Sequence, residues 1–183
     1  MIEFRNVCFS YGDKQILKDF NLKIEDGERV CLFGKSGIGK TTVLRLIMGL
    51  EKPQSGEITV SGSVSAVFQE DRLLPFRTVG ENISFVSGNT DFQPFLEKLN
   101  ISDVKDEYPS ALSGGMARRT AIVRALAGKR DIFIFDEPFT GLDRSNIQSA
   151  CELINEITQG KTVVCVLHEK DYAADLNCKT IEL

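Results

Sequence analysis

The chain has 183 residues, a length that predicts one domain with room for a sizeable hydrophobic core. Its 22 basic residues are outnumbered by 26 acidic ones, and the resulting net charge of −4 argues against nucleic acid or an anionic membrane surface as the principal ligand. Hydrophobic residues make up 42% of the chain and charged residues 26%, which is typical of a globular protein and excludes a disordered one.

The first ten residues, MIEFRNVCFS, lack the basic segment, apolar run and cleavage site of a secretory signal. No apolar run approaches the roughly 20 residues that a membrane-spanning helix needs. The sequence therefore predicts a cytoplasmic protein, for which any membrane role comes from a partner. The five cysteines are odd in number and scattered, so we expect reduced thiols at Cys8, Cys31, Cys151, Cys165 and Cys178.

The N-terminal part of the chain predicts strands followed by a strand–loop–helix unit. Apolar residues alternate with polar ones over 2–4 and 16–24, on either side of a turn at 11–13, which indicates antiparallel strands. The apolar run 29–33 predicts a buried strand. After a glycine-rich loop, the spacing of apolar residues predicts a helix over 41–48.

The middle of the chain changes in character. Two short strands are expected over 57–60 and 64–68, each bounded by glycine or serine. The stretch 72–112 then shows four helix-like pieces and no clear strand. Thr78 and Glu81 have the spacing of a capping box at one helix start. We interpret 72–112 as an inserted helical subdomain.

The C-terminal third alternates between helix and strand, which predicts an α/β fold with a mostly parallel sheet. Helices are expected over 114–127 and 146–157, buried strands over 131–135 and 162–167, and at most one short strand over 179–183. No repeat or low-complexity tract marks a second domain, so 1–183 is predicted to be a single domain in which 1–71 and 113–183 form the core.

A phosphate-binding loop is predicted at 34–41, GKSGIGKT, which fits the pattern G-x-x-x-x-G-K-[ST]. Its glycines let backbone N–H groups approach a phosphate chain, and the N-terminus of the following helix adds a positive field. Lys40 would reach the terminal phosphates, and the Thr41 hydroxyl would hold Mg²⁺. A chance glycine-rich turn is disfavoured by the flanking strand and helix, but the loop alone indicates only nucleotide binding.

Two carboxylates follow the apolar run 132–135 at the carboxyl end of a predicted buried strand, where open α/β sheets bind their ligands. Asp136 suits an indirect role on Mg²⁺, while Glu137 can polarise a water for attack on a γ-phosphate. The alternative, a solvated Asp-Glu pair at a strand end, is disfavoured by the phosphate loop upstream.

A second candidate anion-binding helix start is found at Ser113-Gly114-Gly115. One chain has a single phosphate loop, so this second site suggests that it completes the nucleotide site of another copy. Taken by itself, the segment could equally be a plain Ser N-cap followed by flexible glycines.

Together these motifs resemble the nucleotide-binding domain of the ATP-binding cassette (ABC) family, over nearly the whole chain. The resemblance rests on the loop 34–41, on LSGGM at 112–116 in place of the family's LSGGQ signature, on Asp136-Glu137 and on the turn 141–143. It implies a P-loop NTPase core with a mostly parallel sheet, an antiparallel β subdomain at the N-terminus and an inserted α-helical subdomain.

The resemblance also implies a role for individual residues. Tyr11 would stack on adenine, and Glu137, Gln69 and His168 would serve catalysis, with Gln69 also near the metal. A turn aromatic at Tyr11 and a structural histidine at His168 are the alternatives. The residues implied to contact ATP are Tyr11, Gly34, Lys35, Ser36, Gly37, Ile38, Gly39, Lys40, Thr41, Thr42, Ser113, Gly114, Gly115 and Asp143, and those implied to hold Mg²⁺ are Thr41, Gln69 and Asp136.

In the ABC family two copies pair head to tail, with ATP between the phosphate loop of one and the signature of the other. The resemblance therefore implies a dimeric ATPase that powers a separate membrane permease, at the cytoplasmic face of the membrane. The stretch from Gln69 resembles importers of the nitrate, sulfonate and taurine type, and the permease contact is expected near Arg72, Leu73, Leu74 and Phe76. These side chains could instead pack within the helical subdomain. The alternative function is an ABC ATPase of a soluble assembly machine, such as iron–sulfur cluster assembly.

Overall fold

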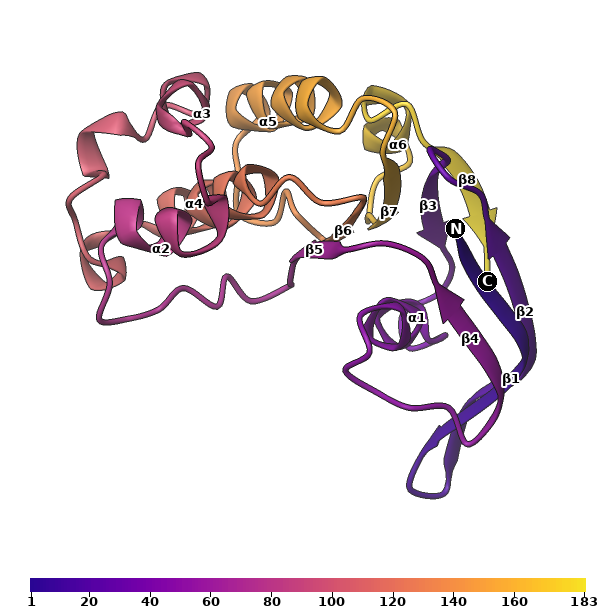
Figure 1. Cartoon of the computed structure of the whole chain (residues 1–183). Coiled ribbons are helices and arrows are strands. Elements are labelled where there is room, and N and C mark those ends of the chain that lie inside the picture. Colours follow the sequence, from indigo (N-terminus) through magenta and orange to yellow (C-terminus); the bar gives the residue numbers. More distant parts are fainter.

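The computed structural model describes residues 1–183 and contains eight strands, six α-helices and two short 3₁₀ helices (Figure 1). In chain order these are β1 (Ile2–Tyr11), β2 (Lys14–Ile24), β3 (Arg29–Phe33), α1 (Lys40–Ile47), β4 (Ser55–Val60), β5 (Val64–Val67), α2 (Val79–Ser87), α3 (Gln93–Lys98), η1 (Ser102–Val104), η2 (Pro109–Ala111), α4 (Gly114–Ala127), β6 (Ile132–Asp136), α5 (Arg144–Ile157), β7 (Thr162–Val166), α6 (Asp171–Asp175) and β8 (Lys179–Glu182).

A five-stranded sheet of order β5-β6-β7-β3-β8 forms the centre of the molecule, and all of its strand pairs are parallel. Strands β6 and β7 are buried along their whole length, and β3 is buried except at Arg29. Strands covered on both faces read as continuous apolar runs, which is why the sequence identified these three. The predicted parallel sheet is confirmed, and the short strand β5 lies at its edge.

A second, antiparallel sheet has the order β2-β1-β4. Ile2 pairs with Ile24 on β2 and with Val60 on β4, which fixes the register of all three strands. The buried residues Ile2, Phe4 and Ile24 belong to the same hydrophobic cluster as the apolar face of α1. Helix α1 is therefore held between the antiparallel sheet and one face of the parallel sheet, as Figure 1 shows.

The opposite face of the parallel sheet is covered by α4, α5 and the segment 72–112. Alternate strand residues such as Phe133 and Phe135 point into this second cluster, while Ile132 and Ile134 point into the first. The segment 72–112 contains α2, α3 and two short 3₁₀ helices and no strand, as the sequence predicts. Residues of α2 and α3 belong to the same cluster as those of α4 and α5.

The predicted capping box of α2 is present. The Thr78 hydroxyl accepts a hydrogen bond from the Glu81 amide at 3.2 Å, and the Glu81 carboxylate accepts one from the Thr78 amide at 2.9 Å. One element was not predicted: the five-residue helix α6, which is too short to show an apolar period and is held by tertiary contacts, among them Tyr172 packed edge-on against Phe139. None of the helices has both the length and the apolar character needed to cross a membrane.

Candidate functional site

The loop 34–39 connects β3 to α1 and leaves the start of α1 without a side-chain cap. Gly39 is the N-cap residue, with φ of 117°, and a Cβ there would lie 2.8 Å from Cγ2 of Ile16. Only glycine fits this close approach in the left-handed region. The first amides of a helix need an acceptor from outside the helix, and no side chain supplies one here. The start of α1 is therefore suited to a phosphate group.

Lys40 lies across this loop. Its ammonium Nζ donates to the carbonyl of Gly34 at 2.7 Å and to that of Lys35 at 3.1 Å. These bonds fix a positive charge against the backbone of the loop. A side chain held in this way can bind the oxygens of a phosphate chain with little loss of rotamer freedom.

A pocket of about 390 Å³ surrounds the loop and unites residues from five separate parts of the chain. Ten predicted site residues line it: Gly34, Ser36, Gly37, Gly39, Lys40, Thr41, Thr42, Gln69, Glu137 and His168. Five others that the sequence analysis missed complete the lining: Lys14, Ile16, Phe33, Val166 and Leu167. Of these, Lys14 had a local signal, since a cation directly after the turn at 11–13 lies on the same hairpin as Tyr11.

Glu137 and His168 meet at the ends of neighbouring strands. The Glu137 carboxylate Oε2 lies 2.9 Å from Nε2 of His168, and the Glu137 side chain is only 16% exposed against 75% for His168. Glu137 has φ of 52°, and its amide donates to the carbonyl of Val166 on β7 at 3.0 Å. A left-handed conformation in a residue other than glycine is strained and is held here by the neighbouring strand, so the carboxylate is aimed by tertiary structure.

Asp136 is buried at the end of β6, and its Oδ1 accepts a hydrogen bond from the Thr41 hydroxyl at 3.5 Å. Burial, and secondly the neighbouring charge of Glu137, raises the pKa of the Asp136 carboxyl above its usual range. A cation beside Asp136 would stabilise the charged carboxylate and so oppose this rise in pKa. The oxygen ligands of Asp136, Thr41 and Gln69 are of the kind that Mg²⁺ prefers, so these residues fit the ion.

Seven predicted nucleotide contacts lie outside this pocket, and three of them are Lys35, Ile38 and Tyr11. Lys35 and Ile38 have exposed side chains on the loop itself. Tyr11 packs edge-on against Phe9, and its hydroxyl donates to the Glu51 carboxylate at 3.4 Å. Tyr11 is 45% exposed at the end of β1.

The signature segment and Asp143 also lie outside the pocket, next to each other. Ser113 is the N-cap of α4 and accepts a hydrogen bond from the Met116 amide at 3.3 Å. A Cβ added to Gly115 would lie 3.6 Å from the carbonyl of Gly141. Asp143 is the N-cap of α5, and the hydrogen bonds it accepts there lower the pKa of its carboxyl. Within one chain, then, the two helix starts that could bind phosphate do not share a pocket.

Two arginines of α4 fix the segment that follows Gln69. Arg118 is 5% exposed and donates to the carbonyl of Phe68 at 2.6 Å and to that of Gln69. Its Nε also lies 3.1 Å from Oδ1 of Asp71, at an angle that makes this an ion pair without a hydrogen bond. Arg124 donates to the carbonyl of Asp71 at 2.8 Å and to that of Arg72 at 2.8 Å.

These contacts tie a residue of the pocket, Gln69, to the helix that begins at Ser113. The sequence analysis missed the role of Arg118 and Arg124, although arginines on the buried side of a helix are a recognisable signal of specific partners. Because both groups are partly removed from water, burial lowers the pKa of Arg124 and raises that of Asp71. The 68–72 segment and α4 should therefore move as one unit.

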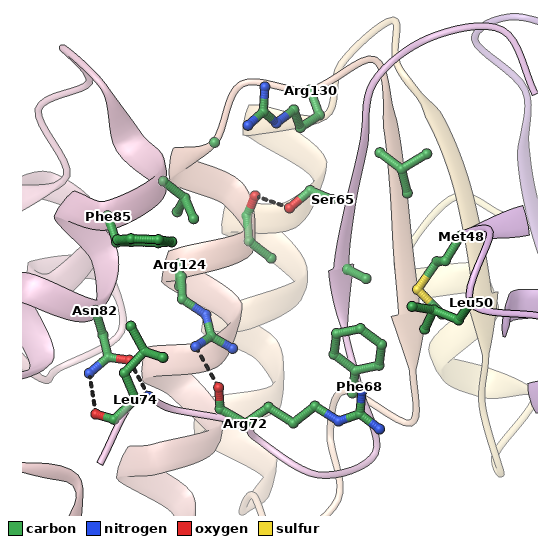
Figure 2. A pocket seen from close by; sticks show the side chains of 15 residues that line it. Met48, Leu50, Ser65, Phe68, Arg72, Leu74, Asn82, Phe85, Arg124 and Arg130 are labelled. Atoms are coloured by element: carbon green, nitrogen blue, oxygen red, sulfur yellow. Dashed lines mark hydrogen bonds between the residues drawn. The ribbon is translucent and has the colours of Figure 1, made fainter. Parts of the chain in front are cut away.

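A second pocket, of about 430 Å³, is an apolar groove between the sheet edge and the helices of 72–112. Figure 2 shows Phe85, Asn82 and Leu74 on one side of it, Arg124 on its floor and Phe68 with Met48 on the other. Of the four residues expected to contact a partner, Arg72 and Leu74 line this groove, while Leu73 and Phe76 do not. Phe76 is 89% exposed.

The chain is similar to known proteins along its whole length. The ABC transporter family model matches residues 17–140. The glutamine transport ATP-binding protein GlnQ of Bacillus subtilis is 37% identical over 202 residues, covering 96% of this chain and 84% of that protein. The aliphatic sulfonates import ATP-binding protein SsuB of Zymomonas mobilis is 38% identical over 195 residues, covering 100% of this chain and 81% of that protein.

Solved structures show the same fold. A dimeric bacterial ABC transporter cassette superposes with a TM-score of 0.86 at 30% identity and covers 100% of this chain and 94% of its own. A dimeric post-hydrolysis state of an ATP-binding cassette, bound to ADP and Pi, gives a TM-score of 0.87 at 29% identity, with coverage of 100% of this chain and 94% of its own.

Proposed function

Because this chain belongs to the ABC transporter family, we propose that it is the energising subunit of an importer, closing on ATP as a head-to-tail dimer that drives a separate membrane permease. The chain is an ATP-binding ATPase of that family. The observation that carries the proposal is the pocket that unites the phosphate loop with Gln69, Glu137 and His168.

In the proposed reaction a water attacks the γ-phosphorus of ATP while the bond to the bridging oxygen of ADP breaks. Glu137 takes the proton of the attacking water; its backbone is held by the hydrogen bond to β7, and its carboxylate is contacted by His168. Lys40 and the N–H groups at the start of α1 stabilise the charge on the phosphate oxygens. We assign His168 to orienting Glu137, which it contacts at 2.9 Å.

Mg²⁺, which the family resemblance implies, would be held through Thr41, Asp136 and Gln69, and it supplies charge neutralisation on the β- and γ-phosphates. Gln69 belongs to the segment fixed by Arg118, so a change at the phosphates would reach α4 through the backbone carbonyls of 68 and 69. This gives the site a mechanical connection to the helix that carries Ser113.

The dimer is proposed because the two helix starts that could bind phosphate, those of α1 and α4, do not share a pocket within one chain. Ser113, Gly114 and Gly115 do not line the pocket of their own chain, and Ser113 and Gly114 are exposed. An exposed helix start with glycines is suited to the nucleotide bound by a second copy. Asp143 is proposed as a further nucleotide contact, and Tyr11 is proposed to stack on the adenine ring.

The dimer is tested with Glu137→Gln, which keeps the shape of the side chain and removes the base. We expect this variant to hold ATP unhydrolysed and to become a dimer by light scattering at saturating Mg-ATP. The matched control is the double variant that also carries Lys40→Ala, which should lose nucleotide binding and stay monomeric. A monomeric Glu137→Gln protein that still binds ATP would contradict the head-to-tail dimer.

The apolar groove is proposed as the permease contact. Leu74 and Phe85 are large apolar side chains, 39% and 79% exposed, and they line the groove next to the segment that Arg124 fixes. A helix of a membrane protein that binds in the groove would therefore be connected to Gln69 through this segment. The relatives reported are transport ATP-binding proteins, which favours a permease over a soluble assembly partner.

This contact is tested by copurification from gently solubilised native membranes. We expect the tagged chain to bring down a multi-span membrane protein in stoichiometric amount, and Phe85→Glu in the groove to abolish this. The control is Tyr108→Glu, which adds the same charge at a site that is 51% exposed and outside the groove. Recovery of soluble partners alone would overturn the transporter function and favour the assembly ATPase.

A further inference from the structure

Four of the five cysteines lie on one side of the parallel sheet, although they are far apart in sequence. Cys31 is on β3, Cys165 on the adjacent strand β7, Cys151 on α5 and Cys178 in the turn before β8. All four belong to the cluster between the sheet and its covering helices or pack against it. None of them has a part in the proposed hydrolysis.

Cys165 and Cys178 are in direct contact. Their sulfur atoms are 3.9 Å apart, and the Cys165 thiol can donate to Cys178 or to the carbonyl of Val30 at 3.5 Å. The Cys178 thiol in turn lies 3.5 Å from the carbonyl of Leu176, to which it can donate. Cys165 is fully buried in a central strand, whereas Cys178 is only partly buried. The guanidinium of Arg29 lies beside this pair, where it also donates to the carbonyl of Leu176 at 2.9 Å.

The surroundings assign different reactivity to these thiols. The hydrogen bond from Cys165 and the positive charge of Arg29 lower the pKa of Cys178, which favours its thiolate. The pKa of Cys165 is raised, chiefly because its thiol donates to Cys178 and secondly by its contact with Cys31. Burial raises the pKa of Cys151 to about 12, so that thiol is inert. Cys178 is thus the nucleophile, and Cys165 is the thiol poised to react next.

We propose that Cys178 and Cys165 are a peroxide-oxidisable pair whose disulfide closes the segment carrying His168 and α6 into a loop. The Cys178 thiolate attacks one oxygen of hydrogen peroxide, the O–O bond breaks, and the products are a sulfenic acid on Cys178 and hydroxide. Cys165 then attacks the Cys178 sulfur, the S–O bond breaks, and the departing hydroxide takes the Cys165 proton. Two thiols and one peroxide become one disulfide and two waters.

The expected consequence follows from where the two sulfurs are anchored. Cys165 cannot move, since its strand is hydrogen-bonded on both sides by β3 and β6. Cys178 must therefore approach the sheet and draw the end of α6 with it, which Figure 1 shows beside β7 and β8. The closed loop contains His168, the residue that contacts Glu137, so oxidation restrains a segment of the candidate site.

The test treats the full chain with hydrogen peroxide and follows it by intact mass and by peptide mapping without reduction. We expect the loss of two hydrogens, a Cys165–Cys178 cross-linked peptide, reversal by dithiothreitol, and hydrogen exchange over 167–177 that is slowed severalfold in the oxidised protein. Cys178→Ser should abolish all of these. Cys8→Ser is the control, because Cys8 lies on β1 and contacts Asp19.

Three results would overturn the proposal. The first is a cross-link between Cys31 and Cys165, and the second is a sulfinic acid on Cys178 without any cross-link. The third is unchanged hydrogen exchange over 167–177 in the cross-linked protein. Since the peptide map is made on the unsubstituted chain, it decides the first two even where Cys178→Ser fails to fold.

Discussion

Replacing Arg118 by Met should strongly destabilise the fold, although the residue makes no contact with the phosphate loop. The side chain is 5% exposed and holds three groups at once: the carbonyls of Phe68 and Gln69 and the carboxylate of Asp71. Met has a similar length and no charge, so it keeps apolar packing while it removes all three polar contacts.

The magnitude follows from what the substitution leaves behind. Breaking a buried ion pair from one side costs about 3–5 kcal/mol, because the remaining charge stays buried without its partner. The Asp71 side chain is 25% exposed and Arg124 remains near it, which places the expected loss at the lower end, about 3 kcal/mol. With a urea m-value of about 2 kcal/mol per molar, the midpoint should fall by about 1.5 M.

The assay is equilibrium urea unfolding, with Lys98→Met as the matched control. Lys98 forms a shorter ion pair, 2.6 Å to Glu152, but the two side chains are 41% and 49% exposed. An exposed pair contributes about 0–1 kcal/mol, so this variant should unfold close to the parent. Arg118→Lys keeps the positive charge but lacks the planar set of donors of a guanidinium, so its loss of stability should lie between those of Arg118→Met and Lys98→Met.

An equal loss of stability in Arg118→Met and Lys98→Met would refute the reasoning, since it rests on burial and not on the presence of an ion pair. A loss of unfolding free energy below about 1 kcal/mol for Arg118→Met would also refute the reasoning, because the two carbonyls and the carboxylate would then have found other partners.

Three further predictions concern local features. Thr78→Ala removes the cap of α2 and should lower the free energy of unfolding by about 1 kcal/mol in urea titrations. Asp136→Asn should stabilise the fold at neutral pH. Burial raises the folded-state pKa of this carboxyl, so its destabilising effect is absent below the unfolded pKa, grows between the unfolded and the folded pKa, and is complete above the folded pKa. A gain that persists in acid would contradict this assignment. Gly56→Ala should lower the free energy of unfolding by more than about 2 kcal/mol, because a Cβ there would lie 2.4 Å from the carbonyl oxygen of Asn6, at φ of 83°. Gly160→Ala is the control: it has φ of 70° but open space around the Cβ, so the loss should be smaller. Similar thermal melts for the two variants would be evidence against the clash.

The features that the sequence predicted well are those in which local chemistry requires particular residues at fixed spacing. The phosphate loop at 34–41 needs glycines beside a strand and a helix, and the capping box of α2 needs Thr78 and Glu81 three residues apart. Strands β6 and β7 are covered on both faces, so their apolar runs were readable without any knowledge of their neighbours. The short helix α6 has no such signal and was missed.

The sequence by itself also determined which side chains we propose for the chemistry, since Asp136, Glu137 and His168 follow predicted buried strands and Lys40 lies in the predicted phosphate loop. Only the tertiary structure decided which of them meet. The contact of Glu137 with His168 depends on β6 and β7 being neighbours in the sheet, and that of Cys165 with Cys178 on the turn that follows α6. The attachment of Gln69 to α4 through Arg118 likewise joins distant segments. Residue spacing encodes contacts within an element, whereas contacts between elements arise from the order of the strands and from which helix covers which face.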